Sequence, residues 1–84
     1  MKTAYYLVTI PAGEFLVTAS TPNGRHLEYF DMFDKAIIYR YFDVHETEVR
    51  RISGKEGARR LLRLVKEGGR PETFASLQRF GNFR

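Results

Sequence analysis

The stretches AYYLVTI (residues 4–10) and FLVTAST (residues 15–21) set the architecture, because both are rich in the β-branched and aromatic residues that favour strands. Pro11, Ala12 and Gly13 interrupt them, and a break this short between two strand-forming stretches is typical of a β-hairpin. The sequence therefore predicts an antiparallel hairpin near the beginning of the chain.

A second turn signal follows the hairpin directly. Pro22 precedes Asn23 and Gly24, and an Asn-Gly pair readily takes the positive φ angles that a tight type I′ turn requires. We expect this turn to lead into a third strand over residues 25–30.

The middle of the chain is less clear. Asp31 and Asp34 suit the N-cap and the first turn of a helix over residues 32–41. The competing interpretation is a strand over residues 36–44, since that segment also contains many residues that favour sheets. A polar, amphipathic edge strand over residues 44–52 is predicted to follow.

The segment after residue 52 has the clearest helical pattern. Ser53 and Glu56 have the spacing of a capping box, and Gly68 and Gly69 suit the end of a helix. The residues that are expected to face the sheet recur at i, i+3, i+4 and i+7, and they are Ala58, Leu61, Leu62 and Val65.

A short last helix is predicted from Pro71 onward. Pro71 suits a first helical turn, Phe74, Leu77 and Phe80 share the helical spacing, and Gly81 would close the helix. The order β-β-β-α-β-α-α indicates an α+β fold with a small, mainly antiparallel sheet covered on one face by helices. With 84 residues, the chain is expected to form a single domain over residues 1–84.

Composition excludes several chemistries. The chain has no cysteine, which rules out a disulfide framework, a thiolate nucleophile and a cysteine-based metal site. Its uninterrupted apolar stretches are only a few residues long, too short to span a membrane or to form the core of a signal peptide. We expect a cytoplasmic protein with no membrane partner.

The net charge of +4 conceals a division along the chain. Residues 1–49 carry four basic and seven acidic side chains, whereas residues 50–84 carry ten basic and three acidic ones. Such asymmetry is typical of a protein with an anionic partner at one end. The residues predicted to bind a partner or nucleic acid are all basic and lie on or just before the helix of residues 54–67: Arg50, Arg51, Lys55, Arg59, Arg63 and Lys66.

Catalytic candidates are few. Potential metal ligands occur at Asp43, His45, Glu46 and Glu48, but in a strand one face would offer at most a histidine and one carboxylate. No serine lies in a nucleophile elbow, and no phosphate-binding glycine loop is present. We therefore expect no enzyme activity, no catalytic residue, no cofactor and no metal, with a small metal-dependent nuclease or hydrolase as the least favoured hypothesis.

The function predicted from these features is binding. The first hypothesis is a small non-enzymatic protein that docks through its charged surface on a protein or nucleoprotein complex, with a homodimer permitted. The chain resembles small phage-encoded inhibitors of host machinery, such as anti-CRISPR proteins, in its size and in its lack of recognisable catalytic motifs. The resemblance involves no matched sequence motif. The alternative hypothesis is direct DNA or RNA binding through the basic helix of residues 54–67, which would make affinity steeply dependent on salt.

Overall fold

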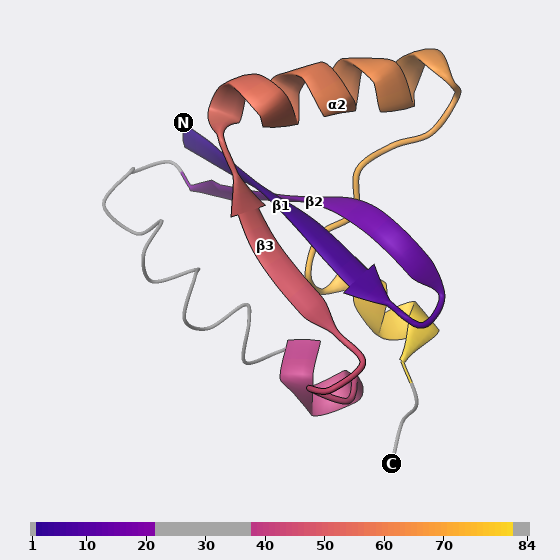
Figure 1. Cartoon of the computed structure of the whole chain (residues 1–84). Helices are drawn as coiled ribbons and strands as arrows, with labels where there is room; N and C mark the ends of the chain where they lie inside the picture. The colour runs from indigo at the N-terminus through magenta and orange to yellow at the C-terminus, as the bar shows by residue number, and fades with distance from the viewer. Residues whose placement is uncertain (1, 22–37, 82–84) are drawn as a thin grey trace.

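The computed structural model describes residues 2–21 and 38–81, and Figure 1 shows them as one sheet with helical segments around it. Strands β1 (Lys2–Ile10) and β2 (Gly13–Thr21) form the predicted antiparallel hairpin. Strand β3 (Glu48–Ile52) pairs antiparallel with the other side of β1, so the strand order is β2-β1-β3. The α+β class with a small antiparallel sheet is confirmed.

Three of the predicted features lie outside the described residues. They are the turn at residues 22–24, the strand over residues 25–30 and the N-cap at Asp31. Of the helix predicted over residues 32–41, the described part, residues 38–41, is helical. The competing strand over residues 36–44 is therefore wrong for this part of the chain.

Strand β3 begins at Glu48, four residues later than predicted, because a turn occupies the residues before it. The carboxylate of Asp43 accepts a hydrogen bond from the backbone N–H of His45 (2.7 Å), and the Asp43 carbonyl accepts one from Glu46 (3.1 Å). An Asp side chain that bonds the backbone two residues later stabilises a turn in preference to a strand.

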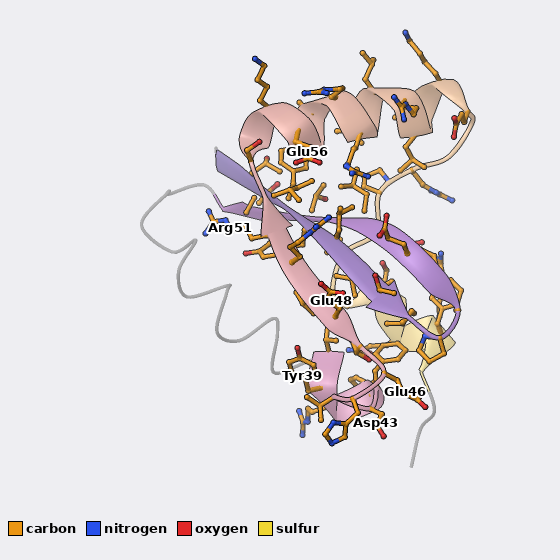
Figure 2. All side chains as sticks on the ribbon, viewed as in Figure 1. Tyr39, Asp43, Glu46, Glu48, Arg51 and Glu56 are labelled. Atoms are coloured by element: carbon orange, nitrogen blue, oxygen red, sulfur yellow. The ribbon has the colours of Figure 1, made fainter. Side chains whose placement is uncertain are left out.

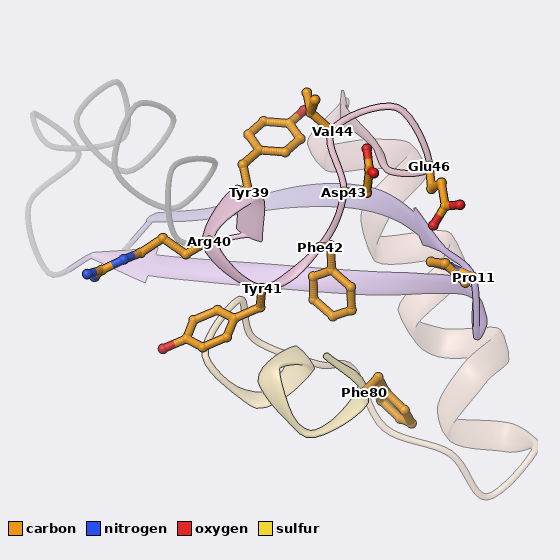
Figure 3. Close-up of a pocket in the computed structure, with 9 residues that line it drawn as sticks. All are labelled: Pro11, Tyr39, Arg40, Tyr41, Phe42, Asp43, Val44, Glu46 and Phe80. Atoms are coloured by element: carbon orange, nitrogen blue, oxygen red, sulfur yellow. The ribbon is translucent and has the colours of Figure 1, made fainter. Parts of the chain in front are cut away.

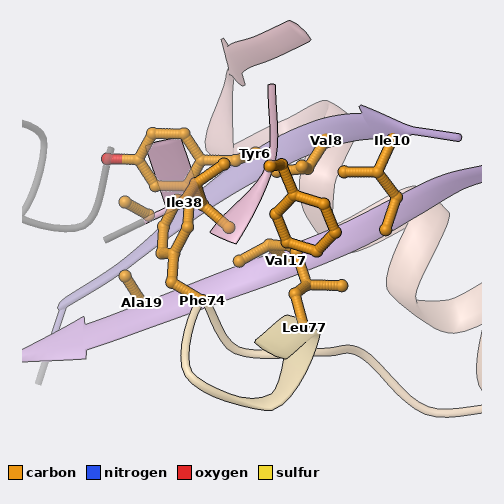
Figure 4. Close-up of a cluster of buried hydrophobic side chains, with 10 residues drawn as sticks. Tyr6, Val8, Ile10, Val17, Ala19, Ile38, Phe74 and Leu77 are labelled. Atoms are coloured by element: carbon orange, nitrogen blue, oxygen red, sulfur yellow. The ribbon is translucent and has the colours of Figure 1, made fainter. Parts of the chain in front are cut away.

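Alternate residues of β1 face opposite sides of the sheet. Tyr6 and Val8 lie on the side that holds the main core, where Tyr6 meets the ring of Phe74 edge-on at 5.1 Å between centroids. Figure 4 shows this cluster between the sheet and the two segments that cover it. Its further buried members are Ala4, Ile10, Val17, Ala19, Ile38, Phe42 and Leu77.

The helix predicted after Ser53 is α2 (Gly54–Lys66); its C-terminal end is as expected, and its N-terminal end has one of the two hydrogen bonds of the predicted capping box. The Ser53 hydroxyl accepts a hydrogen bond from the Glu56 N–H (3.1 Å). At the other end Gly68 has a φ of +81°, and the N–H groups of Gly68 and Gly69 donate to the carbonyls of Val65 (3.0 Å) and Leu64 (2.9 Å). This pair of bonds is a Schellman motif, which satisfies the last carbonyls of the helix.

Helix α2 lies on the opposite side of the sheet from the main core (Figure 1). It contacts Tyr5, whose side chain points away from the core because it alternates with Tyr6. Helical segments thus lie on both faces of the sheet, whereas the sequence predicted helices on one face.

The chain returns from α2 to the core side around the edge of β2. Glu72 forms a single parallel bridge with Val17, in which the Glu72 N–H donates to the Leu16 carbonyl and the Thr18 N–H donates to the Glu72 carbonyl, both at 2.9 Å. These bonds hold residues 71–73 extended, so the predicted last helix is reduced to the 3₁₀ helix η2 (Ser76–Phe80). The N–H of Gly81 donates to the Gln78 carbonyl and closes it, as predicted.

Gly57 packs directly against the Tyr5 side chain. A Cβ atom on Gly57 would lie 2.1 Å from Cγ of Tyr5, well inside contact distance. Gly57 is also the one buried residue of α2. Any side chain at position 57 would therefore push the helix away from the sheet.

We predict that Gly57→Ala lowers the free energy of unfolding by about 1–3 kcal/mol, because the added methyl group overpacks the contact with Tyr5. At an open helical position the same change raises stability by about 0.5–1 kcal/mol. Gly54→Ala is the matched control, since nothing lies within 4 Å of a Cβ atom there. Urea denaturation should show a loss for Gly57→Ala and none for Gly54→Ala; equal effects would contradict the packing described.

Candidate functional site

The orientation of α2 differs from the one predicted. Its contact with the sheet is centred on Gly57, with Leu61 and Leu64 half-buried beside it. Leu62 and Val65, which were predicted to face the sheet, are 58% and 56% exposed, and Ala58, predicted likewise, is exposed as well. The prediction was wrong for these residues because the helix is rotated toward its glycine.

The rotation leaves an apolar strip on the outside of α2. We call it the outer strip and define it as Ala58, Leu62 and Val65, all of which are exposed. At roughly 100° per residue their positions fall within about 60° of one another around the helix axis. The strip therefore presents one narrow apolar surface to the outside.

Four of the predicted binding residues lie next to this strip. We call them the basic row: Lys55, Arg59, Arg63 and Lys66. All four are exposed, and they follow the strip around the helix over about 80° and along it over about 16 Å. Within the described residues none of the four forms an ion pair or a hydrogen bond. Figure 2 shows nitrogen-tipped side chains extending from α2 away from the sheet.

The other flank of the helix is neutralised. Arg60 donates from Nε (3.2 Å) and from a terminal nitrogen (3.1 Å) to one carboxylate oxygen of Glu56, and both side chains are half-buried. The Glu56 carboxylate is thereby engaged with Arg60, while the Glu56 N–H donates the hydrogen bond that caps the helix at Ser53.

The structure separates Arg50 and Arg51. In the register of β3 with β1, Arg50 is opposite Leu7 and Arg51 is opposite Tyr6, so their side chains leave opposite faces of the sheet. Arg50 is on the α2 side, in a small recess that it shares with Glu14 and Glu48. Arg51 is on the core side and cannot join a surface formed by the basic row.

Acidic groups gather at the far end of the molecule from α2. Figure 2 shows Asp43 and Glu46 there, beside Tyr39. In the segments that the structure describes, no three His, Asp or Glu side chains come close enough to hold a metal ion, and His26 lies outside those segments. This end therefore offers negative charge and aromatic surface.

The serine hydroxyls in the described segments are all engaged in local hydrogen bonds, and that of Ser20 shares one with the Thr3 hydroxyl (3.1 Å). Ser53 caps α2, and Ser76 donates to a Glu72 carboxylate oxygen (2.6 Å) and accepts from the Thr73 N–H (2.8 Å). Within residues 2–21 and 38–81, several exposed functional groups are thus aligned on one element at the outer face of α2, which consists of the outer strip and the basic row.

Sequence reasoning found the basic row and missed the outer strip. The missed signal is the width of the apolar arc, which runs from Leu64 past Val65 and Ala58 to Leu62 over about 160°. An apolar arc of about 100° is enough to pack a helix against a sheet. The apolar arc of this helix is wider than that, which indicates that part of it contacts something other than the sheet.

We predict that Leu62→Ser changes the free energy of unfolding by less than about 1 kcal/mol, since Leu62 is exposed. Leu61→Ser should cost about 1–2 kcal/mol more, because it removes a side chain packed beside Gly57. Both substitutions change helix propensity equally, so the difference reports the orientation of α2. A larger loss for Leu62→Ser in chemical denaturation would show the orientation to be wrong.

Comparison with known proteins adds no further constraint. No family model matches the chain, and no curated protein or solved structure is significantly similar to it. Among the described helices, none combines the length and the apolar character that crossing a membrane requires.

Proposed function

We propose that this chain is a small non-enzymatic binding protein that docks on a macromolecular partner through the outer face of α2. One observation carries the proposal: the outer strip lies beside the basic row, which forms no ion pair within the described residues, on the same exposed helix. An amphipathic helix of this kind commonly lays its apolar side chains into a groove on a partner.

The two halves of this face have different roles in the proposal. Burying the exposed part of Leu62 and Val65 would contribute roughly 1 kcal/mol each. The basic row would steer an acidic partner into position and reject basic ones. A protein partner with acidic and apolar surface therefore fits better than a purely anionic polymer.

The class of partner that we propose is a protein or nucleoprotein complex of a host cell, inhibited in the cytoplasm by a phage-encoded protein of this size. Support comes from the small sheet, the engaged serine hydroxyls and the charged helix, which together favour surface occupation over chemistry. An anti-CRISPR-like inhibitor is one form of this proposal.

Capture from host lysate with the tagged protein tests the proposal. We expect a partner that is retained by the wild type and lost, by about tenfold or more in affinity, with Arg63→Glu. Arg51→Glu is the matched control, because it makes the same change in charge on the other side of the sheet. A partner that Arg51→Glu loses as readily as Arg63→Glu would contradict docking through α2.

The second candidate function is direct DNA or RNA binding, and the spacing of the basic row favours it. Four neutralised phosphates predict a slope of about −3.6 for log affinity against log salt on duplex DNA. Gel shifts with DNA and RNA at two salt concentrations measure this slope, and Arg63→Glu should make it shallower by about one. Dissociation constants weaker than tens of micromolar at low salt, on the order of non-specific binding, would remove this candidate.

A further inference from the structure

A groove of about 600 Å³ lies at the end of the molecule opposite α2. Figure 3 shows it between the turn after residues 38–41, the β1–β2 turn and η2. Tyr39, Val44 and Phe80 contribute apolar surface and are 40%, 57% and 39% exposed. Its volume is in the range of about 300–1,000 Å³ in which pockets enclose whole ligands, so it can accept two aliphatic side chains.

The charge of the groove is negative at one rim. Asp43 and Glu46 both line it and are exposed, and Figure 3 shows them next to Val44. In the described part of the chain neither carboxylate forms an ion pair. Arg40 also lines the groove, but Figure 3 shows its side chain extending away from these carboxylates. An occupant of this groove would therefore need apolar side chains beside positive charge.

The outer face of α2 has that combination. Leu62 and Val65 would supply the apolar side chains, and Arg59 and Arg63 run alongside them. Figure 2 shows Tyr39, Asp43 and Glu46 of the groove at the opposite end of the molecule from α2, so the groove and the helix cannot meet within one molecule. Contact between them has to join two copies.

We propose that the outer face of α2 docks into the groove of a second copy of this chain, head to tail. This inference rests on the proposed function of α2 as a docking face and adds a second copy as a weak partner for that face, beside the host complex. Because the two surfaces differ and lie at opposite ends, a dimer leaves one of each unused and can add further copies.

The size of the contact indicates that association is weak. A helix of 13 residues offers a face about 20 Å long and 10 Å wide. That is well below the roughly 800 Å² per partner that stable complexes bury. We therefore expect association at protein concentrations of hundreds of micromolar, strengthened at low salt because charges contribute to it.

Sedimentation velocity across a concentration series is the test. The wild type should increase in mean mass with concentration at low salt and return to monomer at about 0.5 M salt. Leu62→Glu disrupts only the helix face, and Val44→Lys disrupts only the groove. Each of these variants should stay monomeric. Mixed in equal amounts they should form a 1:1 complex that grows no further, because one intact face of each kind remains. Arg51→Glu, outside both surfaces, should behave as the wild type.

Several results would overturn the inference: a wild type that is monomeric throughout, a Val44→Lys variant that associates as the wild type does, or a mixture that stays monomeric. Circular dichroism checks that each variant is folded. If Leu62→Glu or Val44→Lys is not folded, Val65→Glu replaces the helix variant and Tyr39→Lys replaces the groove variant. The wild type could stay monomeric and yet capture another macromolecule that Leu62→Glu no longer captures. That result would overturn the second copy as a partner and leave the proposed function standing. Capture that Leu62→Glu does not affect would remove the docking role of α2 itself.

Discussion

The contact between Gly57 and Tyr5 determines how α2 is presented. A Cβ atom at position 57 would lie 2.1 Å from the Tyr5 ring, so the helix can approach the sheet this closely only because the residue that faces the sheet is a glycine. That rotation brings Leu61 and Leu64 against the sheet and turns Leu62 and Val65 outward. The exposed apolar surface of α2 is thus a consequence of one missing side chain.

The same arrangement gives the molecule two ends of opposite character. The strand alternation of β1 sends Tyr5 to α2 and Tyr6 to the main core, so the two helical layers are built on separate faces. Glu72 carries the chain from one face to the other by bonding to the edge of β2 at Leu16 and Thr18. The basic row therefore lies at one end, and the groove with its acidic rim at the other, although the chain joining them is short.

Local features were predictable, and features set by distant contacts were not. The hairpin and both ends of α2 follow from residues next to each other in sequence, such as Gly68 and Gly69. The rotation of α2 depends on its contact with a strand about fifty residues away in sequence. Leu61 and Leu62 are chemically identical, so helical periodicity alone cannot tell which of them faces the sheet, and the apolar face was predicted wrongly. In the same way, the predicted last helix was shortened because Glu72 is held by β2.

The orientation of α2 is the central claim, and the absence of cysteine makes it directly measurable. Single substitutions Leu61→Cys, Leu62→Cys, Leu64→Cys and Val65→Cys each introduce the only thiol in the chain, whose rate of reaction with a maleimide reports its exposure. Leu62→Cys and Val65→Cys should react nearly as fast as the unfolded chain, and Leu61→Cys and Leu64→Cys several times more slowly. Slow reaction at positions 62 and 65 with fast reaction at 61 and 64 would contradict the account.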